Sequence, residues 1–172
     1  MIRIPSQILL RGALALLVLG IAAPAAAQQL VIVVRHAERA DGGSKSMQAQ
    51  EDPLLSAAGE ARAQRLAAML ADAGVKAIFA TEYKRTQDTG KPLAARLGLT
   101  VQASKGNDAG ALVAKIKAAH ARDVVLVIGH SNTVPSVVKA FGGGAVTVAD
   151  DDYSSVFVVA PSTGAVTRLR LQ

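Results

Sequence analysis

Two short aliphatic stretches, each running into a histidine, decide the fold of this chain. Residues 30–36 read Leu-Val-Ile-Val-Val-Arg-His, and residues 124–130 read Val-Val-Leu-Val-Ile-Gly-His. Five-residue runs of this kind, rich in β-branched side chains and without polar alternation, are typical of strands buried on both faces of a parallel sheet. The carboxyl ends of parallel strands meet at one edge, where open α/β folds bind ligands. We therefore expect His36 and His130 to lie at the same edge of the sheet.

The rest of the sequence alternates between helical and strand patterns. Ser56 fits the N-cap of a helix over about residues 56–73, which Gly74 closes. Further strands are predicted at 76–80 and 99–103, and further helices from 81–86 to about 98, at 108–120 and at 132–141. A turn at 161–164 predicts an antiparallel hairpin of residues 154–160 and 165–171. This order predicts a three-layer α/β/α domain with a mostly parallel central sheet.

Residues 1–27 have the layout of a secretory signal peptide. Arg3 and Arg11 give a positive start, an apolar stretch over 12–21 follows, and three alanines precede Gln28. The apolar stretch is short for a membrane span. We expect a cleaved signal, a single domain over 28–172, secretion to the periplasm or beyond, and no stable membrane insertion after cleavage. The alternative is an uncleaved N-terminal anchor.

Composition narrows the choice of ligand. The chain has no cysteine, so a disulfide framework, a thiolate metal site and a lipoprotein anchor are all excluded. Its formal net charge is +6, and two of these charges belong to the signal segment. The basic residues are scattered and lack aromatic neighbours that could stack on bases. This pattern favours a small anionic ligand over nucleic acid, and it leaves the oligomeric state open.

Four residues combine into a site for phosphoryl chemistry. Arg85 follows the predicted strand at 76–80 near the start of a helix, so it can face the same crevice as Arg35, His36 and His130. Guanidinium groups bind phosphoryl oxygens in forked, charge-assisted contacts, and a neutral imidazole is a competent nucleophile toward phosphorus. Zinc is disfavoured at the two histidines, because no third ligand stands at suitable spacing and the arginines repel a cation.

Four sequence blocks resemble the histidine phosphatase superfamily, in its phosphoglycerate mutase-like branch. They are Arg-His-Ala-Glu at 35–38, Leu-Ser-Ala-Ala-Gly at 55–59, Thr-Glu-Tyr-Lys-Arg-Thr-Gln-Asp-Thr at 81–89 and Gly-His-Ser-Asn at 129–132. They occur in the order and spacing of that family. The resemblance implies its fold, a phosphorylated nucleophile at His36, phosphate clamps at Arg35 and Arg85, and a second phosphoryl-contacting histidine at His130. It implies no metal and no organic cofactor.

The chain departs from the family pattern in its proton donor. Many members of this branch carry a carboxylic acid some way after the second arginine, which protonates the leaving oxygen. Here only Asp108 lies in that region, and Glu82 is a second candidate. Some compact members have no such acid, so the proton donor is Asp108, Glu82 or neither of them. For Glu38 and Arg39, the sequence leaves two roles open: each residue either anchors a loop or contacts substrate.

We thus expect an exported phosphatase that hydrolyses a small phosphomonoester, or a phosphoramidate, through phospho-His36. One alternative is a non-catalytic module that binds a phosphorylated ligand, although pure binding does not require a nucleophile. The other is a protein phosphohistidine phosphatase. Specificity is expected in two segments at the rim of the crevice, residues 39–52 and 104–110.

Overall fold

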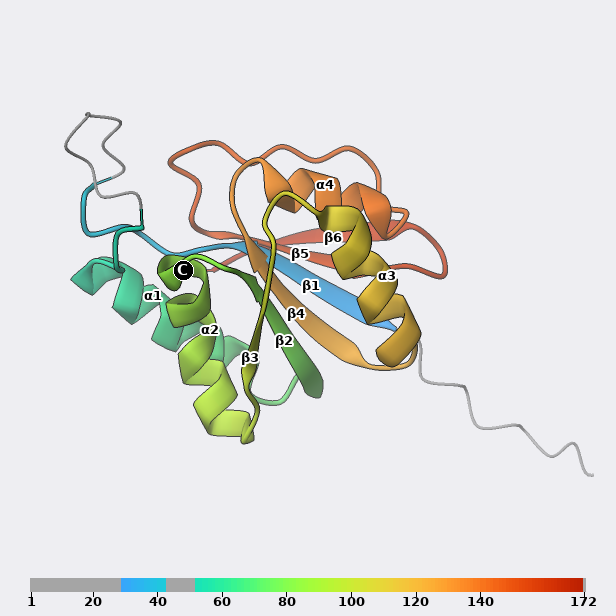
Figure 1. Cartoon of the computed structure of the whole chain (residues 1–172), viewed down its shortest axis with the longest axis horizontal. Helices are drawn as coiled ribbons and strands as arrows, with labels where there is room; N and C mark the ends of the chain where they lie inside the picture. The colour runs from blue at the N-terminus through green and yellow to red at the C-terminus, as the bar shows by residue number, and fades with distance from the viewer. Residues whose placement is uncertain (1–28, 43–51, 172) are drawn as a thin grey trace, which may run out of the picture.

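The computed structural model describes residues 29–42 and 52–171, so the predicted signal segment lies outside the described residues. Strands and helices alternate along these ranges until the C-terminal hairpin (Figure 1). The elements are β1 (Leu30–Arg35), α1 (Ala57–Met69), β2 (Val75–Thr81), α2 (Lys84–Leu97), β3 (Val101–Ser104), α3 (Ala109–Ala119), β4 (Val124–Gly129), α4 (Thr133–Ala140), β5 (Ser155–Ala160) and β6 (Ala165–Arg170).

The strands form one mixed sheet in the order β3-β2-β4-β1-β5-β6. Strands β1 to β4 are mutually parallel, whereas β5 pairs antiparallel with β1 and β6 pairs antiparallel with β5. The mostly parallel sheet and the terminal hairpin are therefore confirmed. The two aliphatic runs of β1 and β4 are direct neighbours at the centre of the sheet, and this explains why both are buried on both faces.

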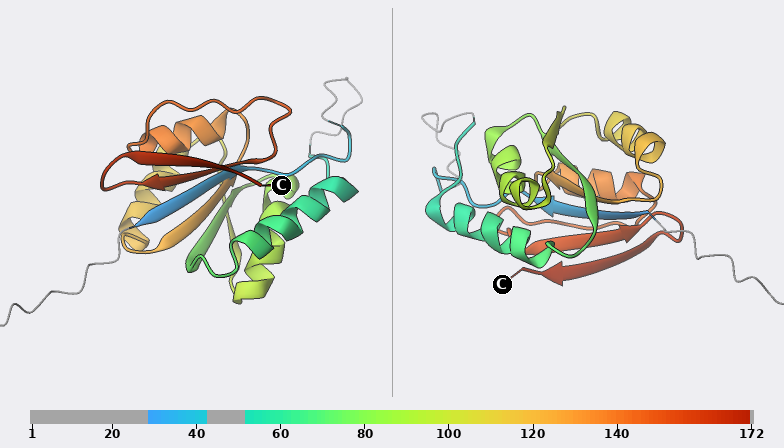
Figure 2. Two further views of the ribbon diagram at one scale, coloured as in Figure 1. Left: turned by 180° about the vertical axis from the view of Figure 1, so that it is seen from behind. Right: turned by 90° about the horizontal axis from the view of Figure 1, so that it is seen from below.

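Helices cover both faces of the sheet (Figures 1 and 2). One apolar cluster packs α3 and α4 against alternate residues of the strands, for example Val31 and Val33 with Ile116 and Val134. A second cluster packs α1 and α2 against the other alternate residues. Because successive strand side chains point to opposite faces, each aliphatic run feeds both clusters. This confirms the three-layer α/β/α architecture.

The first helix is shorter than its sequence pattern predicts. It begins after the N-cap Ser56 as expected but ends at Met69, not near residue 73. The N–H of Ala71 bonds to the carbonyl of Ala68, so the chain tightens into turns with three-residue spacing. Gly74, with φ of 71°, then completes the exit toward β2.

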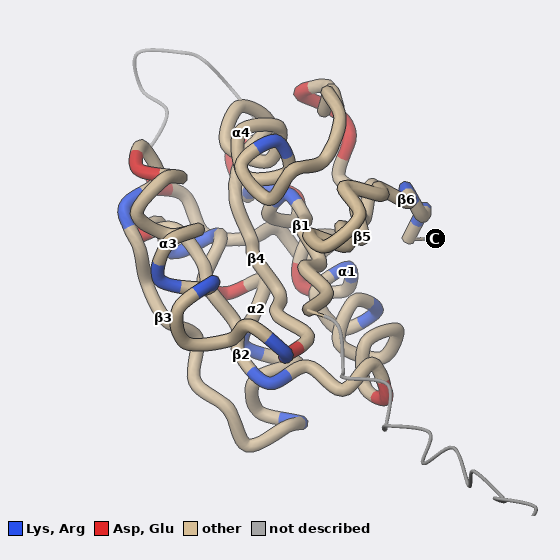
Figure 3. The backbone as a smooth tube through the Cα atoms, turned by 90° about the vertical axis from the view of Figure 1, so that its right-hand side faces the viewer, with Lys and Arg blue, Asp and Glu red and all other residues tan. Residues whose placement is uncertain are grey.

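Charged residues are not confined to one part of the fold. Lys, Arg, Asp and Glu positions are spread over most of the elements (Figure 3). No helix within residues 29–42 and 52–171 combines the length and the apolar character that a membrane span needs.

Candidate active site

The ends of β1 and β4 bring the two histidines together. Arg35 and Gly129 are register partners, and the backbone N–H of His36 donates to the carbonyl of Gly129 at 2.9 Å. The imidazole rings of His36 and His130 consequently meet edge to face, with their centroids 5.2 Å apart. Central strand pairing in the buried core, not a flexible loop, thus fixes the spacing of these two side chains.

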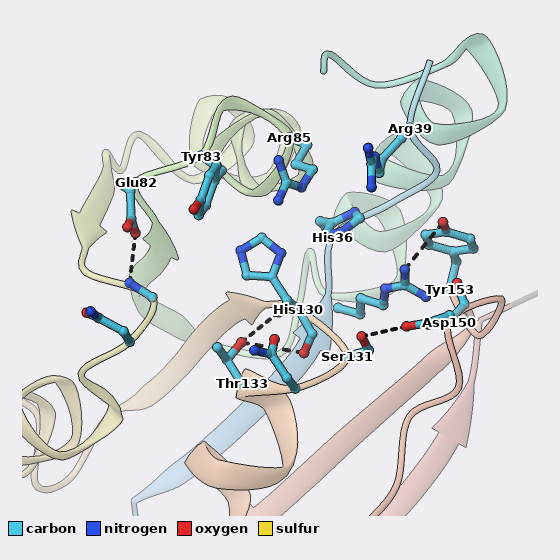
Figure 4. Close-up of a pocket in the computed structure, with 14 residues that line it drawn as sticks. His36, Arg39, Glu82, Tyr83, Arg85, His130, Ser131, Thr133, Asp150 and Tyr153 are labelled. Atoms are coloured by element: carbon cyan, nitrogen blue, oxygen red, sulfur yellow. Dashed lines mark hydrogen bonds between the residues drawn. The ribbon is translucent and has the colours of Figure 1, made fainter. Parts of the chain in front are cut away.

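A pocket of about 450 Å³ opens over the two rings (Figure 4). The structure brings all four residues predicted from sequence to its lining, Arg35, His36, Arg85 and His130. Polar and aromatic side chains complete the wall. They are Arg39, Glu82, Tyr83, Asn107, Ser131, Asn132, Thr133, Asp150 and Tyr153.

His36 is held in the neutral form that a nucleophile requires. It is only 3% exposed, and its Nδ1 lies 2.7 Å from the carbonyl oxygen of Ala37. A carbonyl can only accept, so Nδ1 carries the ring proton and Nε2 keeps its lone pair. Burial is the main cause that lowers the pKa of His36 to about 3, and the charges of Arg35 and Arg85 contribute. The ring is therefore unprotonated on Nε2 at neutral pH.

The Leu-Ser-Ala-Ala-Gly block supports the segment that follows His36. The backbone N–H of Ser56 donates to the carbonyl of Glu38 at 2.9 Å, and a Cβ on Gly59 would lie only 2.2 Å from that same oxygen. The Glu38 carboxylate receives the Arg62 guanidinium, with a closest contact of 2.6 Å. Glu38 therefore anchors the segment, and only its neighbour Arg39 lines the pocket.

Arg35 is held by the loop that precedes β5. Its Nη1 donates to the backbone carbonyls of Ala149 and Asp150, at 3.1 and 2.5 Å. Its guanidinium also lies over the ring of Tyr153, whose hydroxyl is 3.4 Å from Nη2. These contacts come from residues more than a hundred positions along the chain, because β5 pairs with β1.

Arg85 and Arg39 approach the pocket from the other side. Arg85 lies over the ring of Tyr83 and has Nη1 at 3.4 Å from Asp52 Oδ1, while Arg39 pairs with Asp41. Burial is the main cause that lowers the pKa of Arg85. Within the described residues, the buried side-chain nitrogen and oxygen atoms without a hydrogen-bond partner are three guanidinium Nε atoms, those of Arg35, Arg39 and Arg85.

The three arginines that line the pocket give it the chemistry of an anion site. A buried N–H without an acceptor is costly, and native structures leave few of them. A tetrahedral oxyanion such as phosphate offers several acceptor oxygens, and three guanidinium groups around one cavity suit such a ligand. Sequence reasoning identified two of the arginines and left the third, Arg39, undecided.

Two threonines hold His130 in place, one through its ring and one through its backbone. Its Nε2 lies 2.9 Å from Thr81 Oγ1, its backbone N–H donates to Thr133 Oγ1 at 2.7 Å, and its ring meets the Tyr83 ring edge to face. The hydrogen bond to Thr133 requires a glycine at position 129, because a Cβ there would lie 2.4 Å from Thr133 Oγ1. Burial is the main cause that lowers the pKa of His130 to about 4.

The structure separates the two candidate proton donors. Asp108 caps α3, where its Oδ1 accepts from the N–H of Ala111 at 2.8 Å, and it does not line the pocket. Glu82 does line the pocket, and its Oε2 accepts from the N–H of Gly106 at 2.7 Å. Only Glu82 of this pair is therefore placed to reach a bound leaving group.

The rim is built from three segments, of which sequence analysis identified two. From the segment 39–52, Arg39 lines the pocket, and from the segment 104–110, Asn107 does so. Residues 43–51 lie outside the described residues. The third segment, with Asp150 and Tyr153, was not anticipated. An acidic triplet at 150–152 followed by one of only two tyrosines was the available signal. Among the described residues, no three His, Cys, Asp or Glu side chains gather as metal ligands would.

Comparison with known proteins supports the resemblance that the four sequence blocks indicate. Residues 31–106 match the sequence profile of the histidine phosphatase superfamily (branch 1), so three of the four blocks fall in the matched range. A probable phosphoglycerate mutase from Yersinia enterocolitica is 37% identical over 71 residues. The match covers 41% of this chain and 33% of that enzyme, so the chain spans about a third of this curated relative. Both matches support the resemblance of this chain to the histidine phosphatase superfamily, branch 1.

Solved structures confirm the phosphoglycerate mutase-like fold. YhfR from Bacillus stearothermophilus superposes with a TM-score of 0.64 at 17% identity and covers 83% of this chain and 96% of its own. The protein histidine phosphatase SixA, solved with tungstate, gives 0.62 at 17% identity, with coverage of 81% and 94%. A mycobacterial glucosyl-3-phosphoglycerate phosphatase, solved with VO3, gives 0.57 at 18% identity, with coverage of 74% and 92%.

Proposed function

We propose that this chain is an exported phosphatase that hydrolyses a small phosphomonoester, or a phosphoramidate, through a phosphohistidine intermediate on His36. One observation carries the proposal. The buried His36 keeps an unprotonated Nε2 beside a cavity whose three arginines have unpartnered donors. Binding alone requires the arginines but not a nucleophile held in one tautomer. This feature therefore favours an enzyme over a binding module.

The reaction proceeds in two displacements. Nε2 of His36 attacks phosphorus, the bond to the leaving group breaks, and Glu82 supplies the proton that the departing oxygen needs. Arg35, Arg39 and Arg85 neutralise the charge on the equatorial oxygens, so the scheme assigns this task to guanidinium groups and not to a metal ion. Water then attacks phospho-His36 and releases phosphate. For a phosphoramidate, the leaving nitrogen takes the proton.

The test is hydrolysis of p-nitrophenyl phosphate by the chain from Gln28, with a chelator present and a His36→Ala variant as control. We expect turnover by the native chain and none by the variant, and an acid-labile phosphoryl group trapped on the native chain alone. Turnover retained in His36→Ala would rule out the mechanism. Phosphate binding by the native chain without hydrolysis of aryl phosphate, alkyl phosphate or phosphohistidine peptide would establish the binding module instead.

Export is supported by the layout of residues 1–27 and is tested separately. The full chain, expressed with a C-terminal tag in a bacterial host, should be recovered in shortened form from the periplasm. A chain of full mass in the membrane fraction would establish the uncleaved anchor.

A further inference from the structure

A chain of two threonine hydroxyls lies behind His130, away from the pocket. Thr86 Oγ1 is 2.9 Å from Thr81 Oγ1, which is in turn 2.9 Å from Nε2 of His130. Both threonines are buried, at 0% and 5% exposure, at the end of β2 and in the first turn of α2. The proposed mechanism so far uses neither hydroxyl.

The direction of each hydrogen bond follows from counting protons. Thr86 Oγ1 lies 2.7 Å from the carbonyl oxygen of Tyr83 and 3.0 Å from that of Thr81, and carbonyl oxygens only accept. The single hydroxyl proton of Thr86 therefore goes to a carbonyl. The Thr81 hydroxyl must then donate its only proton to Thr86, so it can only accept from the imidazole. Nε2 of His130 consequently carries a proton.

The two histidines thus hold opposite tautomers. In His36 the carbonyl of Ala37 fixes the proton on Nδ1 and leaves Nε2 bare, whereas in His130 Thr81 fixes the proton on Nε2 and leaves Nδ1 bare. Nδ1 of His130 has no hydrogen-bond partner among the described residues, and the ring stands between Tyr83 and His36 in the pocket (Figure 4). The unprotonated nitrogens of both rings are therefore available to the reaction.

We propose that Thr81 is a positioning residue that holds His130 as the Nε2–H tautomer, so that its Nδ1 acts as general base for hydrolysis of phospho-His36. The inference rests on the proposed function. As the water oxygen bonds to phosphorus, the P–Nε2 bond breaks and its electron pair returns to His36. One water proton passes to Nδ1 of His130, and hydrogen phosphate leaves. His130 then loses that proton to solvent.

Burial and the charges around His130 keep its ring unprotonated at neutral pH. Burial and three guanidinium groups lower the pKa of His130 to about 4, and one carboxylate opposes them. The groups that face it are Arg35 from β1, Arg39 and His36 from the segment after β1, and Glu82 and Arg85 from the β2–α2 junction. A general base must be unprotonated before it acts, and His130 meets this requirement.

Tautomer and kinetics test the proposal independently. In ¹⁵N-histidine-labelled protein, with His130 assigned by a His130→Gln variant, we expect the ring proton on Nε2. Thr86→Val frees the Thr81 hydroxyl to donate, so it should move the His130 proton toward Nδ1. A wild-type protein protonated on Nδ1 would overturn the proposal, and this measurement does not depend on activity.

The kinetic arm uses p-nitrophenyl phosphate under pre-steady-state conditions. Thr81→Val should slow dephosphorylation about 10- to 100-fold and enlarge the nitrophenol burst, while Thr81→Ser restores the native rate. Thr167→Val, on the exposed edge strand β6, is the matched control. Equal slowing of both steps, or no slowing, would overturn the proposal. Absence of any phosphoenzyme in the wild type would instead defeat the proposed function and leave the tautomer result standing.

Discussion

The guanidinium carbon of Arg35 lies 4.2 Å from the centroid of the Tyr153 ring. A cation over an aromatic face gains about 0.5 to 2 kcal/mol, depending on its exposure. Here the ring also restricts the plane of a guanidinium that lines the pocket. Tyr153 therefore supports Arg35 from a segment that lies outside β1 and β4.

Replacing Tyr153 tests this support. Tyr153→Leu should raise KM for p-nitrophenyl phosphate about 3- to 10-fold, because Arg35 loses its aromatic platform. Tyr153→Phe retains the ring and loses only the long contact with Nη2, so it should remain within a factor of two or so of the native KM. If the two variants were equally impaired, the hydroxyl and not the ring would be the important contact.

Arg39 is expected to be the third phosphate ligand. Arg39→Ala removes a donor whose Nε is buried at the cavity, and a hydrogen bond to a charged group contributes about 1.5 to 3 kcal/mol. The inhibition constant of inorganic phosphate should thus rise about 10- to 100-fold. Arg65→Ala removes an exposed arginine of α1 and serves as the control for net charge. Equal effects of the two substitutions would show that Arg39 acts only through bulk charge.

Glu82 should matter most for poor leaving groups. Glu82→Gln is expected to lower kcat/KM about 10²- to 10⁴-fold for an alkyl phosphate, because alkoxide departure needs a proton. For p-nitrophenyl phosphate, whose leaving group departs without one, the loss should stay below about 10-fold. Asp108→Asn, at the cap of α3, is the control. A uniform loss over a series of leaving groups would assign Glu82 to binding.

Stability should fall at mildly acidic pH. The pKa of His36 is about 3 in the folded protein, against an ordinary value of 6.5. Between these values the unfolded chain takes up a proton that the folded chain does not, so the free energy of unfolding decreases as pH falls below 6.5. At pH 5 this difference amounts to about 2 kcal/mol. Urea unfolding at pH 7.5 and pH 5 should show it, and His36→Asn should reduce the pH dependence by that amount. An unchanged pH dependence in the variant would contradict the assignment to His36.

The fold was predictable because its signals are local. The aliphatic runs at 30–34 and 124–128, the cap at Ser56 and the turn at 161–164 each specify an element through neighbouring residues. The end of the first helix was predicted too far along, since the tightened turns after Met69 leave the apolar spacing unchanged. Helix ends depend on a few hydrogen bonds that periodicity does not show.

The site was predictable only where it lies on regular elements. Arg35, His36 and His130 follow directly from strand ends, and Arg85 from a helix start. Tyr153 and Asp150 could not be placed in this way, since they reach the pocket through an irregular segment positioned by the pairing of β5 with β1. The roles of Thr81 and Thr86 depend on three distances and a proton count, which no spacing of residues contains.

The backbone contacts that hold Arg35 affect which substitutions the rim of the pocket tolerates. Residues 149 and 150 hold its Nη1 through main-chain carbonyls, which every amino acid supplies. These two contacts therefore do not depend on the side chain at either position, although the Asp150 carboxylate lines the cavity and accepts from the Ser131 hydroxyl at 2.9 Å. Mutational libraries at this rim should yield enzymes with new substrate preferences that still hold phosphate in the original orientation.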